Sequence, residues 1–217
     1  SIKVGWLPKS ELKKAIGWAQ RAVALDPNDY ATYWDLAYCL TCTKDLKQAL
    51  AVFRKSLYLY DNFTDMMDRK PGILAEAADA FVQVGRPQEA IKLLRRAIRV
   101  PDWYRWNLSW AFFHTGDYEN AIRQIDAMDL GPGHELFVIE IQLFLAAACA
   151  KRAEQLARHG DPVESNKLLI RAKEAIARLK IDRPKCTIAS IRDRFPDLKR
   201  KSDERKWLAA LRMAGLK

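Results

Sequence analysis

The sequence predicts an all-α protein built as an α-solenoid, a right-handed superhelix of stacked helical hairpins with capping helices at its C-terminal end. Three observations predict this fold. A short motif that ends in alanine recurs along the first 130 residues, the apolar residues around each copy follow the period of a helix, and glycine or proline separates the periodic segments.

The recurring motif ends at an alanine, and the distance between copies sets the length of the repeat. The four alanines are Ala15, Ala49, Ala90 and Ala121, which are 34, 41 and 31 residues apart. A period of 34 residues is typical of repeats made of two helices and a turn. The second interval has seven additional residues, which fall in the polar stretch 61–70, so we expect a longer loop there.

Each alanine is expected to open the second helix of a hairpin. A packing residue follows four positions later and a small or flexible residue seven positions later, so all three share one helix face. The first helices show a complementary pattern of buried positions, as in Leu36, Ala37 and Leu40. Proline and glycine stand where helices should end or turn, at Pro27, Gly85, Pro101 and Gly116.

These segments resemble a known family. Residues 33–61, 71–100 and 103–128 resemble tetratricopeptide repeats. The runs AQRAVALDPND at 19–29, GRPQEAI at 85–91, PDWYRWNL at 101–108 and LAALRMAGL at 208–216 are similar to the C-terminal repeat region of bacterial multidomain proteins. In those proteins an adenylate/guanylate cyclase domain or a winged-helix DNA-binding domain precedes the repeats.

The resemblance implies a non-catalytic part of a larger bacterial signalling protein, with any catalytic domain outside this chain. The first residue is Ser1 rather than Met, so we expect the chain to be a piece of a longer protein. The pattern departs from the family in the first hairpin, because Gly5 and Pro8 interrupt residues 2–8 and leave them too short for a full first helix.

The chain is expected to form a single solenoid with three regions. Residues 1–130 carry about three and a half hairpins. Residues 131–184 form a lengthened, degenerate hairpin, with helices at about 134–158 and 163–179, and residues 185–217 form short capping helices. In the last region we expect Trp207, Leu208 and Leu211 to cover the outermost helix face, which a solenoid must shield from water.

The net charge of +10 is confined to the last third of the chain. Residues 1–150 hold 18 Lys and Arg against 18 Asp and Glu, whereas residues 151–217 hold 19 against 9. We favour an ordinary solvated face, because acidic residues are interspersed among the basic ones. Two alternatives stay open: nucleic-acid or acidic-partner binding, for which Arg171, Arg178, Lys180, Arg183, Lys185, Arg192 and Arg194 would have to share one face, and a homodimer through Trp207 and Leu211.

The sequence carries no signature of an enzyme, a cofactor site or a metal site. It has no phosphate-binding loop, no dinucleotide-binding glycine motif and no nucleophile elbow. Cys39 and Cys42 form a C-x-x-C pair, but they lie within a helical pattern and no second pair follows at ligand spacing. We therefore expect free thiols and a cytoplasmic protein, with no segment apolar enough to cross a membrane.

The predicted site is the concave surface of the solenoid, which the first helices of the hairpins line. Helix geometry predicts which residues of the first helices face this surface, next to the buried positions. These residues form a groove that is aromatic and partly acidic, suited to a peptide or helix with apolar residues and some positive charge. A carboxylate-binding mode is disfavoured there, because acidic groups would repel a carboxylate. The candidate residues are Trp34, Asp35, Tyr38, Glu76, Asp79, Trp103, Trp106, Asn107, Trp110 and Phe113.

Overall fold

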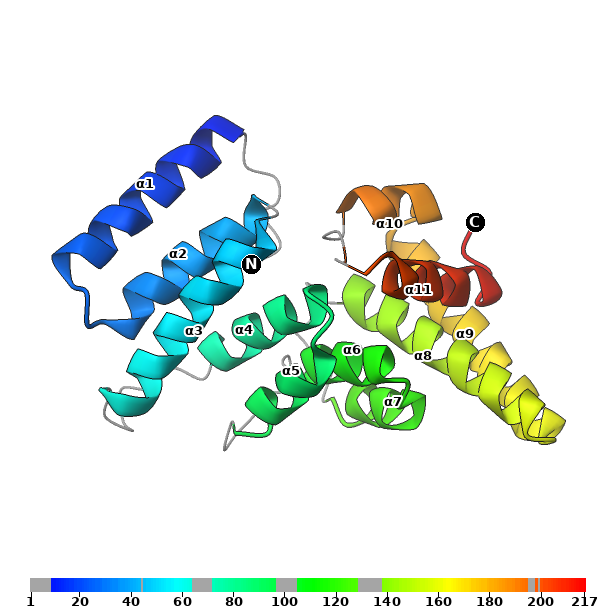
Figure 1. Ribbon diagram of the computed structural model, residues 1–217. Coiled ribbons are helices and arrows are strands. Elements are labelled where there is room, and N and C mark those ends of the chain that lie inside the picture. The colour runs from blue at the N-terminus through cyan, green and yellow to red at the C-terminus, as the bar shows by residue number, and fades with distance from the viewer. Residues whose placement is uncertain are drawn as a thin grey trace.

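The computed structural model describes residues 9–43, 45–63, 72–96, 105–128, 138–194, 198 and 200–217. Every regular element in these ranges is an α-helix, which confirms the predicted fold class (Figure 1). The helices are α1 (Lys9–Leu25), α2 (Tyr30–Cys42), α3 (Leu46–Asn62), α4 (Gly72–Gln83), α5 (Pro87–Leu94), α6 (Arg105–Thr115), α7 (Tyr118–Asp126), α8 (Val138–Arg158), α9 (Pro162–Asp182), α10 (Ile188–Arg194) and α11 (Lys201–Met213).

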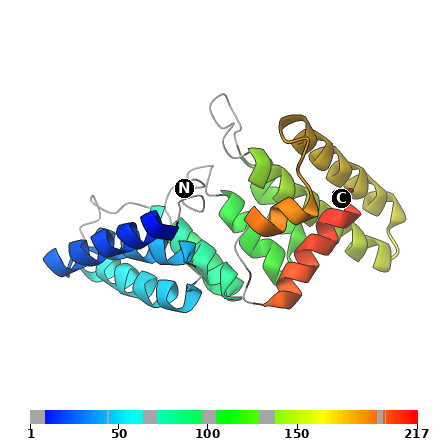
Figure 2. The same ribbon diagram turned by 90° about the horizontal axis from the view of Figure 1, so that it is seen from above.

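Consecutive helices pair into hairpins: α2 with α3, α4 with α5, α6 with α7, and α8 with α9. Figure 2 shows these hairpins stacked from α1–α3 at one end to α8–α9 at the other. The first helices α2, α4, α6 and α8 also contact one another in succession, whereas the second helices chiefly meet their own partner and the next first helix. The stack therefore curves toward the first helices, and the surface that they share is called the inner face below.

Three of the four motif alanines lie in the core, and the fourth, Ala15, is half-buried. Ala49, Ala90 and Ala121 are fully buried. A larger side chain at any of these positions would hold the two helices of the hairpin apart. Ser56, seven residues after the first of them, is also fully buried, and its hydroxyl donates to the carbonyl of Tyr30 at 2.6 Å. This bond fastens α3 to the start of α2 and satisfies a hydroxyl that would otherwise be costly to bury.

The hairpin turns repeat one local arrangement. At the end of α6, Gly116 has a φ of 86°, and the next amide, Asp117, donates to the carbonyl of Phe112 at 3.1 Å. Glycine suits this left-handed position because it has no Cβ. The carboxylate of Asp117 then caps α7 by accepting from the amide of Asn120. The same bonding pattern occurs at the turn between α8 and α9.

The last hairpin is formed by α8 and α9. Helix α9 begins one residue before and ends three residues after the predicted helix at 163–179, and α8 ends at residue 158 as predicted, while residues 134–137 lie outside the described residues. The middle of α8 is apolar on nearly every side. Its fully buried residues are Leu143, Ala146, Ala147, Ala148, Cys149 and Ala150. Such a helix must have neighbours all round, and α8 contacts α6, α7, α9 and α11. No described helix is both long and apolar enough to cross a bilayer.

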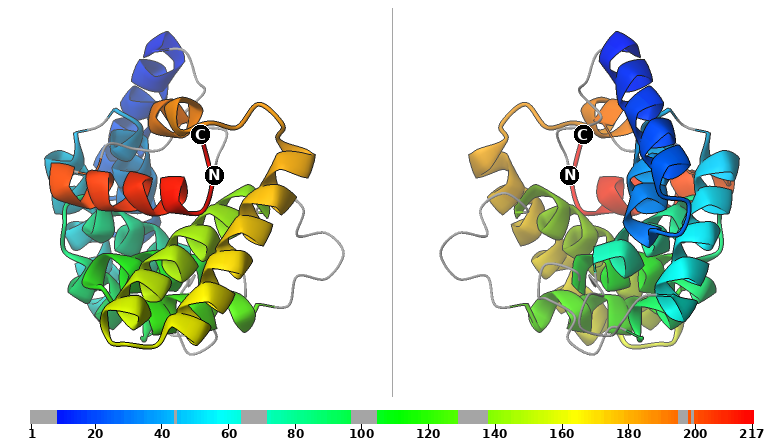
Figure 3. Two further views of the ribbon diagram at one scale, coloured as in Figure 1. Left: turned by 90° about the vertical axis from the view of Figure 1, so that its right-hand side faces the viewer. Right: turned by 90° about the vertical axis from the view of Figure 1, so that its left-hand side faces the viewer.

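The last helix lies on a different face from the one expected. The sequence suggested that Trp207, Leu208 and Leu211 shield the outermost helix, which is α9. Instead α11 packs on α8 and reaches α6 on the inner face, with α10 beside it (Figure 3). The outer side of α9 keeps apolar residues exposed, including Val163 and Ile181. An amphipathic helix can cover either surface, and the inner face offers the larger aromatic contact.

Candidate peptide-binding surface

The inner face of α2 and α4 brings together five of the predicted site residues. Trp34, Asp35 and Tyr38 come from α2, and Glu76 and Asp79 come from α4. Asp35 is exposed and the other four are half-buried, so each retains some surface that a partner could contact. We call these five residues the open inner surface.

A hydrogen bond across two hairpins organises the open inner surface. The indole N–H of Trp34 donates to a carboxylate oxygen of Glu76 at 2.5 Å, although the residues are 42 positions apart. One turn further along α4, Asp79 accepts from the side-chain amide of Gln83 at 2.8 Å. Both carboxyl groups are therefore held in position by neutral donors rather than by a lysine or arginine of the described chain.

Burial alters the acidity of these two carboxyl groups. Desolvation, together with the nearby charges of Asp79 and Asp35, raises the pKa of Glu76 to about 7, although the hydrogen bond from Trp34 lowers it. Desolvation likewise raises the pKa of Asp79 to about 6, while the bond from Gln83 lowers it. A cation brought beside this pair would compensate the buried negative charge, so the surface favours a positively charged ligand group.

The predicted residues of α6 lie in different surroundings. Trp110 and Phe113 are only 6% and 2% exposed, and Asn107 is also buried. Trp106 is half-buried and stacks on Phe144 of α8 with centroids 5.8 Å apart. These four residues do form one helix face, as their spacing predicts, but α8 and α11 cover it. Trp103, the remaining candidate, lies outside the described residues.

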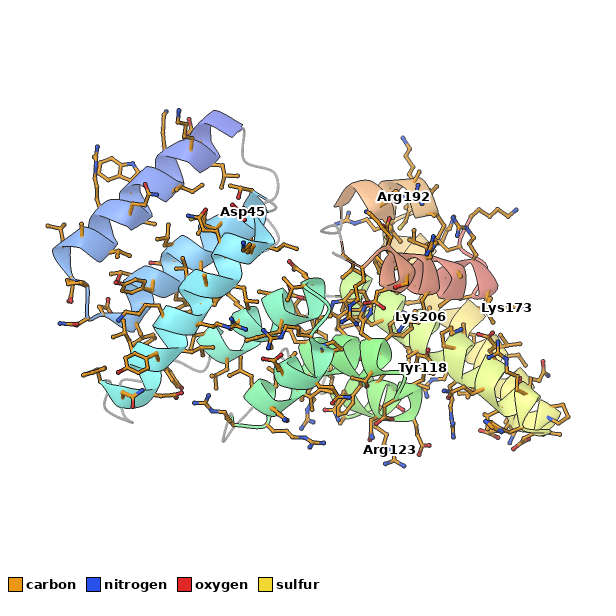
Figure 4. The ribbon with its side chains drawn as sticks, in the orientation of Figure 1. Asp45, Tyr118, Arg123, Lys173, Arg192 and Lys206 are labelled. Carbon is orange, nitrogen blue, oxygen red and sulfur yellow. The ribbon has the colours of Figure 1, made fainter. Side chains whose placement is uncertain are left out.

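Helix α11 supplies part of the cover over α6, beside α8, and this role of α11 was not predicted. Trp207 packs edge to face on Trp110. Lys206 lies 5.4 Å from the centre of the Phe113 ring, and its ammonium donates to the carbonyl of His114 at 3.3 Å (Figure 4). The apolar spacing of α11 identifies its buried side, but it does not say which helix that side meets.

His114 is the most perturbed base in the described structure. Its ring is buried against Trp110, with centroids 4.1 Å apart, and neither ring nitrogen has a hydrogen-bond partner among the described residues. Desolvation, assisted by the positive charge of Lys206, lowers the pKa of His114 to about 3. The imidazole is therefore neutral at physiological pH, which suits a packing role rather than proton transfer.

The cysteines lie where a structural role is expected. Cys39 and Cys42 are free, half-buried thiols, and burial raises the pKa of both. Burial also raises the pKa of Cys149 to about 12. Thiols with raised pKa values are poor nucleophiles. Within the described ranges, no group of three or more His, Cys, Asp or Glu side chains is arranged to hold a metal ion.

The basic residues of the last third are distributed over several helices. Arg171 pairs with Asp126 of α7, and Arg192 on α10 pairs with Glu204 of α11 at 3.5 Å. Lys173 lies on α9 (Figure 4). Some of these basic side chains thus form ion pairs within the chain. Trp207 and Leu211, the residues considered for a homodimer, are buried inside the protein.

Comparisons with known proteins agree with the fold of stacked helical hairpins. Residues 76–135 match the tetratricopeptide repeat family. The fold is similar to that of YrrB, a TPR protein with an unusual peptide-binding site, with a TM-score of 0.56 and 18% identity over 82% of this chain and 85% of that chain. It is also similar to the MamA RS-1 ArsTM double mutant, with a TM-score of 0.56 and 16% identity over 80% and 90% of the two chains.

No curated protein matches the sequence. The family match covers most of α4 and all of α5, α6 and α7, and the structural similarity extends the same architecture to most of the chain. This protein therefore carries tetratricopeptide repeat sequence in residues 76–135 and has, over most of its length, the helical-hairpin fold of tetratricopeptide-repeat proteins.

Proposed function

We propose that this protein is a non-catalytic protein–protein interaction module that binds a peptide or helix on the open inner surface of α2 and α4. The ligand expected there has apolar residues next to a lysine or arginine. The half-buried rings of Trp34 and Tyr38 offer apolar contact area, and the carboxyl groups of Glu76 and Asp79 offer acceptors for a cationic group.

The observation that carries this proposal is the hydrogen bond from Trp34 to Glu76. It holds an aromatic ring of one hairpin beside a carboxyl group of the next, with both side chains partly accessible. A site preorganised in this way needs little ordering when a ligand arrives, which favours affinity. The resemblance to bacterial multidomain proteins supports a regulatory role in a cytoplasmic signalling protein.

A peptide-display selection against the full chain tests the proposal. Enriched peptides should contain Lys or Arg beside apolar residues, and their binding should weaken at least about tenfold in a Trp34→Ala/Glu76→Gln chain. The matched control is Trp18→Ala on α1, a tryptophan that is 66% exposed and does not belong to this surface. The control should bind the selected peptides as the unaltered chain does.

Two results would contradict the proposal. One is that no peptide is enriched above the background of the empty support. The other is that the selected peptides bind the unaltered and the Trp34→Ala/Glu76→Gln chains equally well, while circular dichroism shows the same helix content for both. Equal binding would place the ligand on another part of the molecule.

A further inference from the structure

The surface beneath α11 has the features of a ligand site rather than of a hairpin interior. It consists of Trp110, Phe113 and His114 of α6 together with the adjoining face of α8, and we call it the α11 seat. It belongs to the same inner face that α2 and α4 leave open. Helix α11 is not the second helix of any repeat: it packs on α8 and also touches α6 through Trp207 and Lys206.

Helix α11 is placed on this seat as an amphipathic ligand would be. Its residues Trp207, Leu208 and Leu211 are at most 3% exposed, whereas Ala209 and Arg212 on the other side face water. The aromatic ring meets Trp110, and the aliphatic residues lie one and four positions further on. An aromatic residue followed by aliphatic ones on the same face is the usual pattern of a helix bound in a groove.

A positive charge completes the contact at the end of α6. Lys206 donates to the carbonyl of His114, which belongs to the last turn of that helix. The C-terminal end of a helix carries partial negative charge and unpaired carbonyls, so it attracts a cation. The seat thus recognises a lysine next to the aromatic residue, in addition to the apolar face.

The seat also holds polar groups that α11 does not satisfy. The two ring nitrogens of His114 are buried and have no hydrogen-bond partner among the described residues. Water would solvate these nitrogens if α11 left, and this solvation offsets part of the cost of exposing the apolar surface. A fully apolar interface would have no such compensation, so this one is suited to exchange its occupant.

We propose that the α11 seat is a docking site for an external amphipathic helix with the pattern Lys-Trp-Leu-x-x-Leu, and that α11 is its resident occupant, which such a helix displaces. The site is distinct from the open inner surface of α2 and α4, so this inference does not depend on the proposed function. The external helix and α11 therefore compete for the α11 seat, so the external helix binds only those molecules from which α11 has been released.

The test uses the full chain and a fluorescein-labelled synthetic peptide with the sequence of residues 200–217. In a Trp207→Ala/Leu211→Ala chain the resident helix is weakened, so this chain should bind the peptide at least about tenfold more tightly than the unaltered chain in fluorescence anisotropy. The control peptide carries alanine in place of the same tryptophan and leucine, and neither chain should bind it.

Two outcomes of the anisotropy measurement would overturn the proposal. The altered chain could keep its helix content and cooperative unfolding yet fail to bind the peptide, or it could bind both peptides equally. A concentration-dependent dimer of the unaltered chain, dissociated by the peptide, would assign the seat to α11 of a second copy and also overturn it.

Native-state hydrogen exchange on the unaltered chain decides the matter if the double substitution prevents folding. Release of α11 alone predicts that its amides exchange at least about tenfold faster than those in the middle of α8 and α9. If the amides of all three helices exchange together, through a single global opening, then α11 is a fixed part of the core and the proposal is wrong.

Discussion

The indole rings of Trp110 and Trp207 meet edge to face, with their centroids 5.0 Å apart and their planes at 72°. Residue 110 belongs to the third of the four hairpins in the described residues and residue 207 to the last described helix, so this pair joins the repeats to the C-terminal segment. Geometry of this kind is favourable beyond the area buried, because the positive edge of one ring faces the negative face of the other.

Replacing Trp207 with alanine should lower the free energy of unfolding by about 3–5 kcal/mol, as expected for truncation of a large buried aromatic residue. If α11 is released by this change, then adding Leu211→Ala should lower stability little further, since a detached helix no longer packs on the hairpins. Urea denaturation followed by circular dichroism measures both. Met213→Ala, on the exposed side of the same helix, is the control and should change stability by less than about 0.5 kcal/mol.

Replacing Glu76 with glutamine should stabilise the protein above pH 7. The pKa of Glu76 is raised from 4.5 in the unfolded chain to about 7 in the folded protein. The folded state therefore binds the proton more tightly, and this contribution to stability is lost as the pH rises through 7. The glutamine still accepts from Trp34 but never ionises.

The expected difference between the Glu76→Gln and unaltered chains at pH 8 is at most about 3 kcal/mol, reduced where water reaches the half-buried group. It should fall toward zero below pH 4.5. Thermal unfolding monitored across this pH range would test the sign. A variant that is less stable than the unaltered chain at pH 8 would show that the carboxylate is well solvated or paired.

His114 should make the protein sensitive to acid. Its pKa is lowered from 6.5 to about 3, so below pH 6.5 the unfolded chain binds a proton that the folded protein excludes. Stability should therefore decline as the pH falls from 7 to 5, by about 2 kcal/mol from this residue alone. A His114→Gln chain lacks this titrating imidazole, and comparing its urea midpoint with that of the unaltered chain at both pH values isolates the effect from that of Glu76. Parallel pH dependence in the two chains would contradict the prediction.

Replacing Gly85 with alanine should cost slightly more stability than the same change at Gly116, because the flexible, exposed side chain of Arg200 has to move aside. Both glycines have a positive φ, of 81° and 86° respectively, so both substitutions strain the backbone by about 1–2 kcal/mol. A Cβ on Gly116 would meet open space, whereas one on Gly85 would lie 2.6 Å from Nε of Arg200, just before α11. The additional cost at Gly85 should disappear in an Arg200→Ala background. If it persists there, the contact with Arg200 is not its cause.

Short-range sequence patterns were sufficient to predict the helices and their pairing. Ala49 and Ala90 report close helix crossings directly, because only a small residue fits there. The shared face of Trp106 and Trp110 also follows from their spacing. Whether that face is open cannot be read from spacing, since the answer depends in part on α11, which begins 91 residues after Trp110.

The position of α11 depends on tertiary contacts, which the spacing of its own apolar residues does not specify. The outer side of α9 and the inner face of α6 and α8 are both apolar enough to receive Trp207 and Leu211. The inner face prevails because it supplies aromatic partners and a helix end for Lys206. Similarly, Glu76 and Asp79 were assigned to one face from their spacing, but the hydrogen bond from Trp34 depends on how two hairpins are stacked.

The contact between Lys206 and His114 joins residues that are 92 positions apart, and it changes how a repeat protein is expected to unfold. An array in which each unit touches only its neighbours behaves like a one-dimensional chain and can lose its ends piece by piece. The C-terminal segment from Arg200 through α11 links the turn after α4 to α6 and α8, so it makes non-adjacent units interdependent. As long as α11 stays in place, the stretch from α4 to α9 should open as one unit, whereas α1–α3, at the far end of the stack, can fray independently.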